Sequence, residues 1–274
     1  MGAHGVKRRT SGRSPTPALD RFELYELAVT DAARLVPFLR SVHGGDPRTL
    51  REDFCGSGAL ARHWPGAVPA GIAIAVDADA RPLKKLTGHP RLKTVHADVR
   101  EAADRADIIA ATNFPLGYWH SRAELLAYLR HARGCLKPSG IFIADIYGGV
   151  TAFTPGSQTQ RLRGPSAQRI DYAWEQVAAD PLSGRVHNAI HFRVTPKGAS
   201  RAKNFRNAFT YDWRLWSIPE LRDAMLEAGF KSVEVYDRVG GALDQHGNLH
   251  VRPLADGEPL DDDYVVYVVG RRGG

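Results

Sequence analysis

Three acidic residues each belong to a short run that is typical of a buried strand. Glu52 lies in "TLREDF", Asp77 ends "GIAIAVD", and Asp98 ends "LKTVHAD". A carboxylate at the carboxyl end of such a strand can accept hydrogen bonds from both hydroxyls of a ribose, and this role fits Asp77. Asp98 can accept one from an exocyclic amine, with Val99 against the face of a base. Either aspartate could instead cap the helix that follows it.

Two glycines one residue apart, Gly56 and Gly58, lie between the first run and a helical pattern in "EDFCGSGALARHW". Because glycine has no Cβ, backbone N–H groups at these positions can approach a ligand closely. The loop lacks the Gly-Lys-Ser/Thr of a phosphate loop and the third glycine of a dinucleotide fingerprint. On this motif alone, a tight turn without a ligand is an equal alternative.

The elements that must position these residues alternate along the chain. We expect helices at 56–64, 78–88 and 121–137, one or two more within 21–45, and strands at 49–54, 71–77, 92–98, 106–113 and 140–149. Nearly apolar strands separated by helices predict a parallel sheet that is covered on both faces. The fold class expected is therefore a doubly wound α/β fold.

The rhythm changes at about 150–212, where apolar residues alternate with polar ones in "RIDYAWEQ", "RVHNAIHFRV" and "NAFTYDWRLW". Turn-forming sequences separate these segments, so we expect an antiparallel β meander inserted after the fifth strand. A helix follows, with Ser217 and Glu220 as a capping box and Gly229 at its end. Two final strands are predicted in "SVEVYD" and "DYVVYVVG".

In combination, these motifs resemble those of the class I S-adenosylmethionine-dependent methyltransferases. The resemblance rests on "EDFCGSG", "AVDAD", "HADV" and "LKPSGIFIADIYGG", and on a final helix and strand pair similar to the family's antiparallel hairpin. It covers roughly residues 46–150 and the C-terminal elements. It implies a mostly parallel seven-stranded sheet and S-adenosyl-L-methionine as the cofactor.

The resemblance also implies roles for single residues. Glu52 would bind the amino end of the cofactor, the loop with Gly56 and Gly58 would pass under its methionine part, and Asp77 would bind the ribose. The residues implied at the cofactor are Glu52, Phe54, Gly56, Gly58, Asp77, Ala78, Asp98, Val99, Asn113 and Phe114, the last two near the sulfonium. Phe54 departs from the family's pattern, because many members have glycine there, and this puts the path of the loop in doubt.

A catalytic base is needed only if the acceptor must lose a proton. Four residues near the expected crevice are candidates: Tyr118, His120, Asp145 and Tyr147. His120 could instead cap the helix that begins at "HSRAEL". Asp53 is expected to be solvated or to face a helix, and Cys55 to pack as a small residue rather than act as a nucleophile.

The formal net charge of +7 arises partly from Lys7, Arg8, Arg9 and Arg13, in a segment that we expect to be a flexible basic tail at 1–17. Residues 18–274 are expected to form one methyltransferase domain.

Basic and aromatic residues do not interleave as in a nucleic-acid groove, so we expect a small-molecule acceptor rather than nucleic acid. The inserted meander would either cover that acceptor or form homodimer contacts.

Only two cysteines occur, and no run of about 18 apolar residues suggests a membrane span. A reducing compartment, the cytoplasm, and no metal site are therefore expected. Two alternatives stay open: a nucleotide-dependent oxidoreductase, because Asp77 suits a ribose there too, and a non-catalytic S-adenosylmethionine-binding protein.

Overall fold

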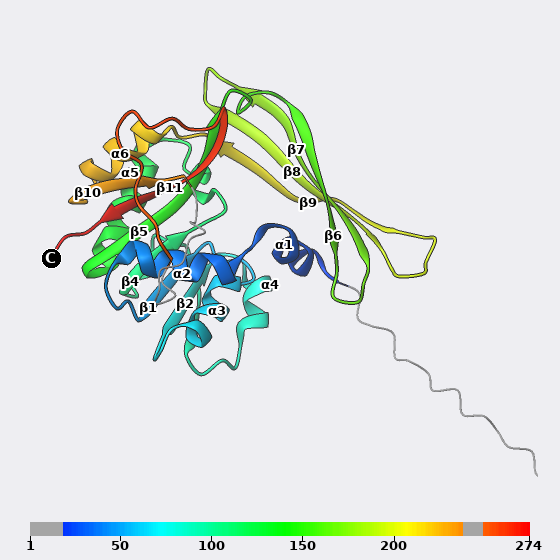
Figure 1. Ribbon diagram of the computed structural model, residues 1–274, viewed down its shortest axis with the longest axis horizontal. Helices are drawn as coiled ribbons and strands as arrows, with labels where there is room; N and C mark the ends of the chain where they lie inside the picture. Colours follow the sequence, from blue (N-terminus) through cyan, green and yellow to red (C-terminus); the bar gives the residue numbers. More distant parts are fainter. Residues whose placement is uncertain (1–18, 238–248) are drawn as a thin grey trace, which may run out of the picture.

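Seven strands form one mixed sheet, called sheet A, in a computed structural model that describes residues 19–237 and 249–274 (Figure 1). Its spatial order is β10-β11-β5-β4-β1-β2-β3. The strands are β1 (Thr49–Asp53), β2 (Ile72–Asp77), β3 (Leu92–His96), β4 (Ala106–Ala111), β5 (Leu136–Gly149), β10 (Ser232–Tyr236) and β11 (Asp263–Arg271). Strands β1 to β5 pair in parallel, and β11 runs antiparallel to both β5 and β10. The predicted seven-stranded sheet with a final antiparallel pair is confirmed.

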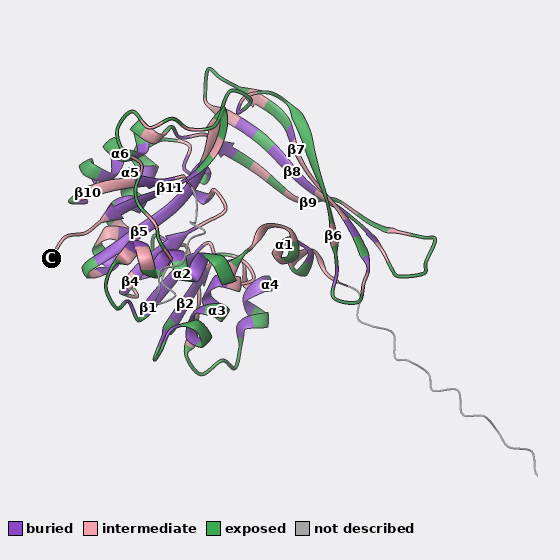
Figure 2. Ribbon diagram, viewed as in Figure 1, coloured by how far each residue is buried: buried purple, intermediate pink, exposed green. Residues whose placement is uncertain are grey.

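Helices cover both faces of sheet A. Figure 2 shows that the residues along its strands are accordingly buried. On β4, Ile109 packs in the cluster that includes α5 (Arg122–Cys135) and α6 (Ile218–Glu227). Its neighbour Ile108 points the other way, into the cluster with α2 (Ala32–His43) and α3 (Ala59–Ala67). Successive side chains of a strand face opposite sides, so a continuous apolar run fills two cores.

Local capping signals define where the helices begin and end. Ser217 accepts from the N–H of Glu220, whose carboxylate accepts from the Ser217 N–H, as predicted. Gly229 has a φ of 96°, the left-handed conformation expected after a helix. The segment 21–45 contains two helices, α1 (Arg21–Val29) and α2. Within 19–237 and 249–274, no helix combines the length and apolarity needed to span a membrane.

Four strands form the second sheet, called sheet B, in the order β6-β7-β8-β9. They are β6 (Gly156–Arg163), β7 (Arg169–Asp180), β8 (Arg185–Thr195) and β9 (Lys203–Arg214), all antiparallel and inserted between β5 and α6. The predicted meander is confirmed, and it extends slightly past the expected boundary. It has one strand more than its alternating sequence suggested, because β6 is polar and exposed along most of its length.

Helix α1 bridges the two sheets (Figure 1). Leu24 is fully buried in the core of sheet B, against Ile190 and Phe192. On its other side, Glu26 accepts hydrogen bonds from Arg62 of α3 at 2.5 and 2.6 Å. The helix therefore fixes sheet B over the loops at the carboxyl edge of sheet A.

Candidate functional site

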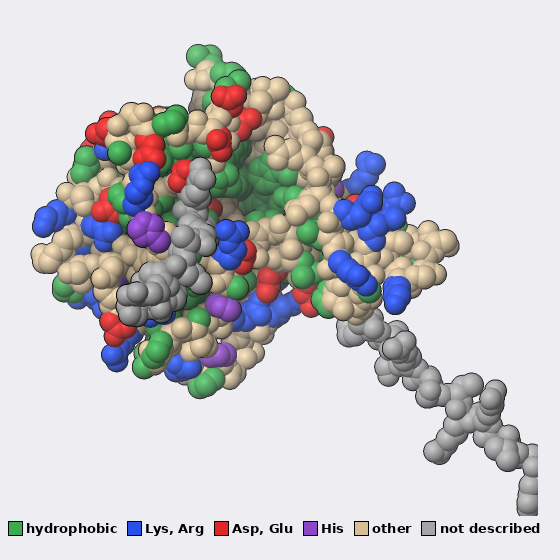
Figure 3. All heavy atoms as spheres, in the orientation of Figure 1, with side chains coloured by type: hydrophobic (Ala, Val, Ile, Leu, Met, Phe, Trp, Pro, Cys, Tyr) green, Lys and Arg blue, Asp and Glu red, His purple; other side chains and the backbone are tan. Residues whose placement is uncertain are grey.

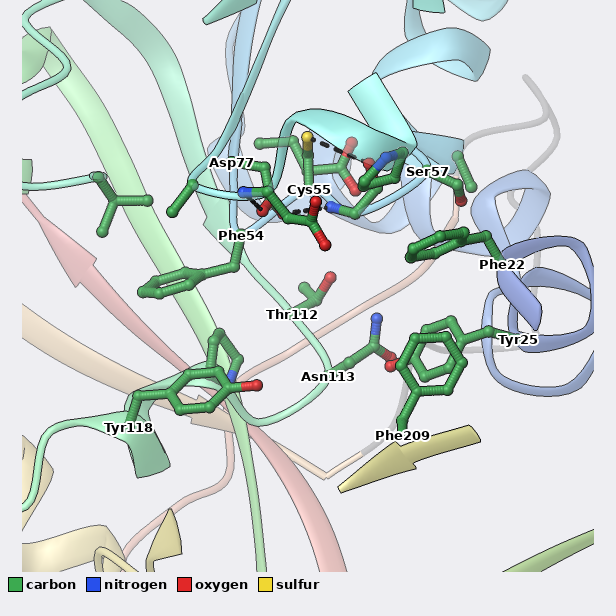
Figure 4. A pocket seen from close by; sticks show the side chains of 18 of the residues that line it. Phe22, Tyr25, Phe54, Cys55, Ser57, Asp77, Thr112, Asn113, Tyr118 and Phe209 are labelled. Carbon is green, nitrogen blue, oxygen red and sulfur yellow. Dashed lines mark hydrogen bonds between the residues drawn. The ribbon is translucent and has the colours of Figure 1, made fainter. Parts of the chain in front are cut away.

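A cavity of about 620 Å³ lies at the carboxyl ends of β1, β2 and β4, under α1 and β9; we call it the first chamber. Figure 4 shows Asp77 and Cys55 on one side of it and Tyr118 and Phe209 on the other, with Thr112 between them. The predicted cofactor residues that line it are Glu52, Phe54, Gly56, Asp77, Ala78, Asp98, Val99 and Asn113. The structure thus brings together eight residues chosen from four separate stretches of sequence. Gly58 and Phe114 do not line this chamber.

The loop after β1 is left-handed at three alternate positions. Phe54, Gly56 and Gly58 have φ values of 55°, 51° and 62°. Phe54 therefore adopts the conformation that glycine would favour, at a cost of about 1–2 kcal/mol. Its ring packs against Tyr118 and Tyr128, at centroid distances of 6.0 and 5.8 Å, which offsets this cost. A Cβ at Gly58 would lie 2.6 Å from Leu86 Cδ1, so that glycine serves close packing.

Asp77 supports the glycine loop directly. Its Oδ2 accepts from the Gly56 N–H at 2.7 Å, and its Oδ1 accepts from the Asp79 N–H at 2.8 Å. A carboxylate has about four acceptor positions, so two remain for ligand hydroxyls. Burial raises the pKa of Asp77.

The cap of the next helix, α4 (Ala80–Leu83), is Asp79 rather than Asp77, so the alternative of Asp77 as a helix cap is wrong. The predicted helix at 78–88 is α4 followed by a 3₁₀ turn, η1 (Lys84–Leu86).

Glu52 is buried beneath the first turn of α3. Its Oε2 accepts from the Ala61 N–H at 2.7 Å, and only 7% of the residue is exposed. Burial raises the pKa of Glu52 to about 8, although the hydrogen bond from Ala61 opposes this shift. The carboxyl group therefore holds a proton near neutral pH and can release it when a cation binds beside it.

Asp98 follows β3 at the far end of the first chamber. Arg100 Nη2 donates to its Oδ2 at 2.6 Å, and this hydrogen bond lowers the pKa of Asp98. The residues after Asp98 form a turn, so the alternative of Asp98 as a helix cap is wrong. Val99 is 3% exposed and lines the chamber, which presents an apolar surface beside the carboxylate.

A buried ion pair holds this turn in place. Arg51 Nε lies 2.6 Å from Asp53 Oδ1, and both side chains are fully buried. Arg51 also donates to the carbonyls of Val99 and Ala102, at 3.1 and 2.8 Å. The Tyr128 hydroxyl donates to Asp53 at 2.9 Å. Of the two settings expected for Asp53, the solvated one is wrong and the helix-facing one is confirmed, because its carboxylate faces Tyr128 of α5. The carboxylate also balances the arginine that ties β1 to the turn after β3.

Asp145 organises the turn after β4. Asn113 and Phe114 both have left-handed φ values, 70° and 65°. Their N–H groups donate to the Asp145 carboxylate at 3.0 and 2.8 Å. Burial raises the pKa of Asp145 to about 6. Because Asp145 does not line the first chamber and its carboxylate accepts from these two backbone N–H groups, this candidate base acts as a positioning residue for the turn.

The other candidate bases lie in three different settings. Tyr118 lines the first chamber. His120 Nε2 lies 2.8 Å from the carbonyl oxygen of Asp212, and the histidine lines neither chamber described here. Tyr147 lies in a neighbouring cavity, and burial raises its pKa to about 12.

That neighbouring cavity, which we call the second chamber, has a volume of about 710 Å³. It lies between the carboxyl end of β5 and the inner face of sheet B, and Phe114 lines it. Tyr25, Asn113 and Trp213 line both chambers, so the two are contiguous.

Aromatic residues of two elements cover the first chamber, and sequence reasoning expected those of the meander but missed those of α1. Phe22 and Tyr25 come from α1, and Phe209, Tyr211 and Trp213 come from β9. The signal for the β9 residues was their alternation, which places them on one face of a strand. No comparable signal pointed to α1.

Charge is distributed unevenly over the surface. Figure 3 shows lysine and arginine side chains gathered on sheet B, away from the opening between the sheets, where hydrophobic side chains are visible. Among the described residues that line the two chambers, Arg81 is the one cation, and it pairs with Asp79 at 2.5 Å. The chambers therefore lack the basic lining of a nucleic-acid groove.

Comparisons with known proteins bear on the fold. No sequence profile of a known family matches the chain, and no curated protein sequence matches it. A methyltransferase from Clostridium acetobutylicum that depends on S-adenosylmethionine has a similar structure over 92% of this chain and 97% of its own, with a TM-score of 0.66 and 16% identity.

Two further structures cover almost the whole chain. The sugar N-methyltransferase KedS8 from Streptoalloteichus matches 99% of this chain and 100% of its own, with a TM-score of 0.66 and 16% identity. CalS10, an amino pentose methyltransferase from Micromonospora echinaspora, was solved with S-adenosylmethionine bound. It matches 94% of this chain and 100% of its own, with a TM-score of 0.65 and 13% identity. At these identities the likeness is one of architecture: this chain has the fold of the class I S-adenosylmethionine-dependent methyltransferases.

Proposed function

We propose that the protein is a methyltransferase that uses S-adenosyl-L-methionine and methylates a small-molecule acceptor. The observation that carries this proposal is the convergence of Glu52, Asp77 and Asp98 in one chamber beside the glycine loop. In open α/β sheets, ligands bind at this carboxyl edge, where the strand order reverses. Here the reversal lies between β1 and β4.

The first chamber fits the chemistry of this cofactor part by part. Glu52 would face the amino group, Asp77 has two acceptor positions left for the ribose hydroxyls, and Asp98 with Val99 would bind the adenine. A Cβ at Gly56 would meet no atom within 4 Å, so the loop is open where a ligand would lie against it. At about 620 Å³, the chamber is within the usual range for a ligand of this size.

The second chamber is the proposed acceptor site. S-adenosylmethionine supplies, when bound, an electrophilic methyl group on a sulfonium. The turn at Asn113 and Phe114, held by Asp145, lies where the chambers meet and would orient the acceptor towards that group. Alignment of reacting atoms at short distance contributes much of the rate enhancement in such transfers. Residues of α1 and β9 line the first chamber and partly cover it.

Two of the structural neighbours support a small acceptor, since one is a sugar N-methyltransferase and another an amino pentose methyltransferase. The chambers' lack of unpaired cations among the described lining residues supports the same view. A cytoplasmic location belongs to the same proposal and is supported by Cys55 and Cys135, which are buried free thiols. A homodimer stays a prediction.

The test is a thermal-shift series with S-adenosylmethionine, S-adenosylhomocysteine and NAD, followed by mass spectrometry of S-adenosylhomocysteine formed with a metabolite extract. We expect stabilisation by the first two ligands and extract-dependent product formation. Stabilisation by NAD alone would contradict the proposal in favour of an oxidoreductase. Ligand binding without turnover on any extract would favour a non-catalytic binding protein.

A further inference from the structure

Four aromatic side chains form a closed set at the junction of the two chambers; we call them the aromatic box. Phe114 contacts Tyr147 at a centroid distance of 5.0 Å, and Tyr147 contacts Trp174 at 6.4 Å. Trp174 contacts Trp213 at 5.8 Å, and Trp213 contacts Phe114 at 6.0 Å. All four rings line the second chamber, and Trp213 also lines the first. Three of the four contacts are close to perpendicular, so the rings present faces in different directions.

The surrounding structure fixes the rings of the box. The backbone of Phe114 is held by Asp145, and the Tyr147 hydroxyl accepts from the buried amide of Asn188 at 3.1 Å. A Cβ at Gly117 would lie 2.7 Å from Trp213, so the 3₁₀ turn η2 (Pro115–Tyr118) packs directly against that ring. Rings that are fixed before a ligand arrives lose little entropy when they bind it.

The charges around the box favour a positively charged group. Among the described residues, no lysine, arginine or histidine lines the second chamber. Its one acidic residue in the described parts of the chain is Asp263, which accepts from the Thr151 hydroxyl at 2.7 Å. The faces of aromatic rings carry partial negative charge and attract cations, most strongly where water is excluded. An anionic acceptor would find no counterion among these side chains.

The same lining bears on the chemistry of transfer. An alcohol would need a base to remove its proton during attack. Asp145 lines neither chamber, and Tyr147 keeps its own proton until about pH 12. A neutral amine is nucleophilic enough to attack without help from a base. An alkyl amine that arrives protonated first releases that proton to solvent.

We propose that the methyl acceptor is the nitrogen of an amine, and that the aromatic box binds this group and stabilises the positive charge it gains. This inference rests on the proposed function and specifies its substrate class. The nitrogen lone pair forms the bond to the methyl carbon while the bond from that carbon to sulfur breaks, and its electron pair stays on sulfur. The nitrogen becomes positively charged, and its excess proton then leaves to solvent.

The test uses three isosteric probes and needs no knowledge of the natural acceptor. Choline is cationic, 3,3-dimethylbutan-1-ol is its neutral counterpart, and 3,3-dimethylbutanoate is anionic. Calorimetry is done on the full chain saturated with S-adenosylhomocysteine. We expect choline to bind about two- to five-fold more tightly than the alcohol, as ring–cation attraction in a site open to solvent implies, and the anion not to bind. Equal or weaker binding of choline, or no binding of any probe, would overturn the inference.

Two variants locate the effect. Trp174→Leu removes one face of the box, and we expect it to abolish most of the preference for choline, with Trp174→Phe intermediate. Phe205→Leu is the matched control, because Phe205 belongs to sheet B but lines neither chamber. Loss of the preference in both variants, or in neither, would contradict the assignment. Binding of S-adenosylhomocysteine, measured first, separates the two proposals: its absence defeats the proposed function, whereas its presence without a choline preference defeats only this inference.

Discussion

The carboxylate of Asp145 accepts a hydrogen bond from the Phe114 N–H at 2.8 Å, which ties the middle of sheet A to a left-handed turn between the two chambers. In Asp145→Asn, one of the two backbone donors would face an amide NH₂ group. We expect a loss of about 1.5–3 kcal/mol in the free energy of unfolding, the usual value of hydrogen bonds to a charged group. Urea denaturation measures it. The control is Asp180→Asn at the exposed end of β7, where the carboxylate also accepts from a backbone N–H, that of Leu182. An equal effect in both variants would contradict the role of Asp145.

Glu52 is expected to make the stability of the protein depend on pH. Its pKa is raised from the ordinary 4.5 to about 8, so the folded chain keeps this proton where the unfolded chain has lost it. The contribution of protonated Glu52 to the stability of the folded state is complete below about pH 4.5 and is lost as the pH rises towards 8. Glu52→Gln keeps an acceptor for the Ala61 N–H without the titration.

We therefore expect the wild type to lose stability relative to Glu52→Gln as the pH rises from 5 to 8. The difference in their free energies of unfolding should change by at least about 1.4 kcal/mol, which corresponds to one pKa unit. Urea denaturation at a series of pH values measures it. Glu101→Gln, at an exposed position, serves as the control. A difference that stays constant with pH would show that Glu52 titrates normally.

The buried pair of Arg51 and Asp53 is expected to be costly to break. Arg51→Met leaves the Asp53 carboxylate buried without its partner, and such changes cost about 3–5 kcal/mol. Replacing both residues with apolar ones should recover much of this loss, because no uncompensated charge remains. Chemical denaturation of the two single variants and the double variant measures the coupling. Additive losses would mean that the ion pair does not act as a unit.

Neither His120 nor Tyr147 is expected to behave as an essential base. His120→Gln should leave turnover within a factor of about two, since His120 lies outside both chambers. Tyr147→Phe should lower kcat by less than ten-fold, whereas loss of a general base costs about 10²–10⁴-fold. It should also destabilise the protein by about 1–3 kcal/mol, because the buried Asn188 amide loses its partner. A loss of 10²-fold or more in Tyr147→Phe would restore it as a base.

Much of sheet A was predictable because burial leaves a periodic trace in the sequence. The strands are apolar on both faces, and the capping pair Ser217 and Glu220 marks a helix start with local chemistry. The acids at strand ends could be placed in one crevice because the carboxyl ends of parallel strands share an edge. The strand β6 could not be found, because an edge strand that is exposed on both faces shows no alternation.

The rest of the site depends on contacts between distant residues. Tyr25 reaches the first chamber only because α1 docks on sheet B, where its ring lies 5.0 Å from that of Phe209. The buried pair of Arg51 and Asp53 was not predicted, because sequence alone does not reveal that the carbonyls of Val99 and Ala102 complete the arginine's hydrogen bonds. Phe54 raised doubt about the loop, yet its ring packing allows a left-handed backbone without glycine.

The most direct test of the central claim is calorimetric titration of S-adenosylhomocysteine into the wild type and Asp77→Asn. We predict that the wild type binds this ligand and does not bind NAD. The variant should bind more weakly by about 1.5–3 kcal/mol, because Asp77 loses charge-assisted hydrogen bonds to the ribose. Asp180→Asn should bind like the wild type. An unchanged dissociation constant in Asp77→Asn, or binding of NAD with no response to S-adenosylhomocysteine, would contradict the account.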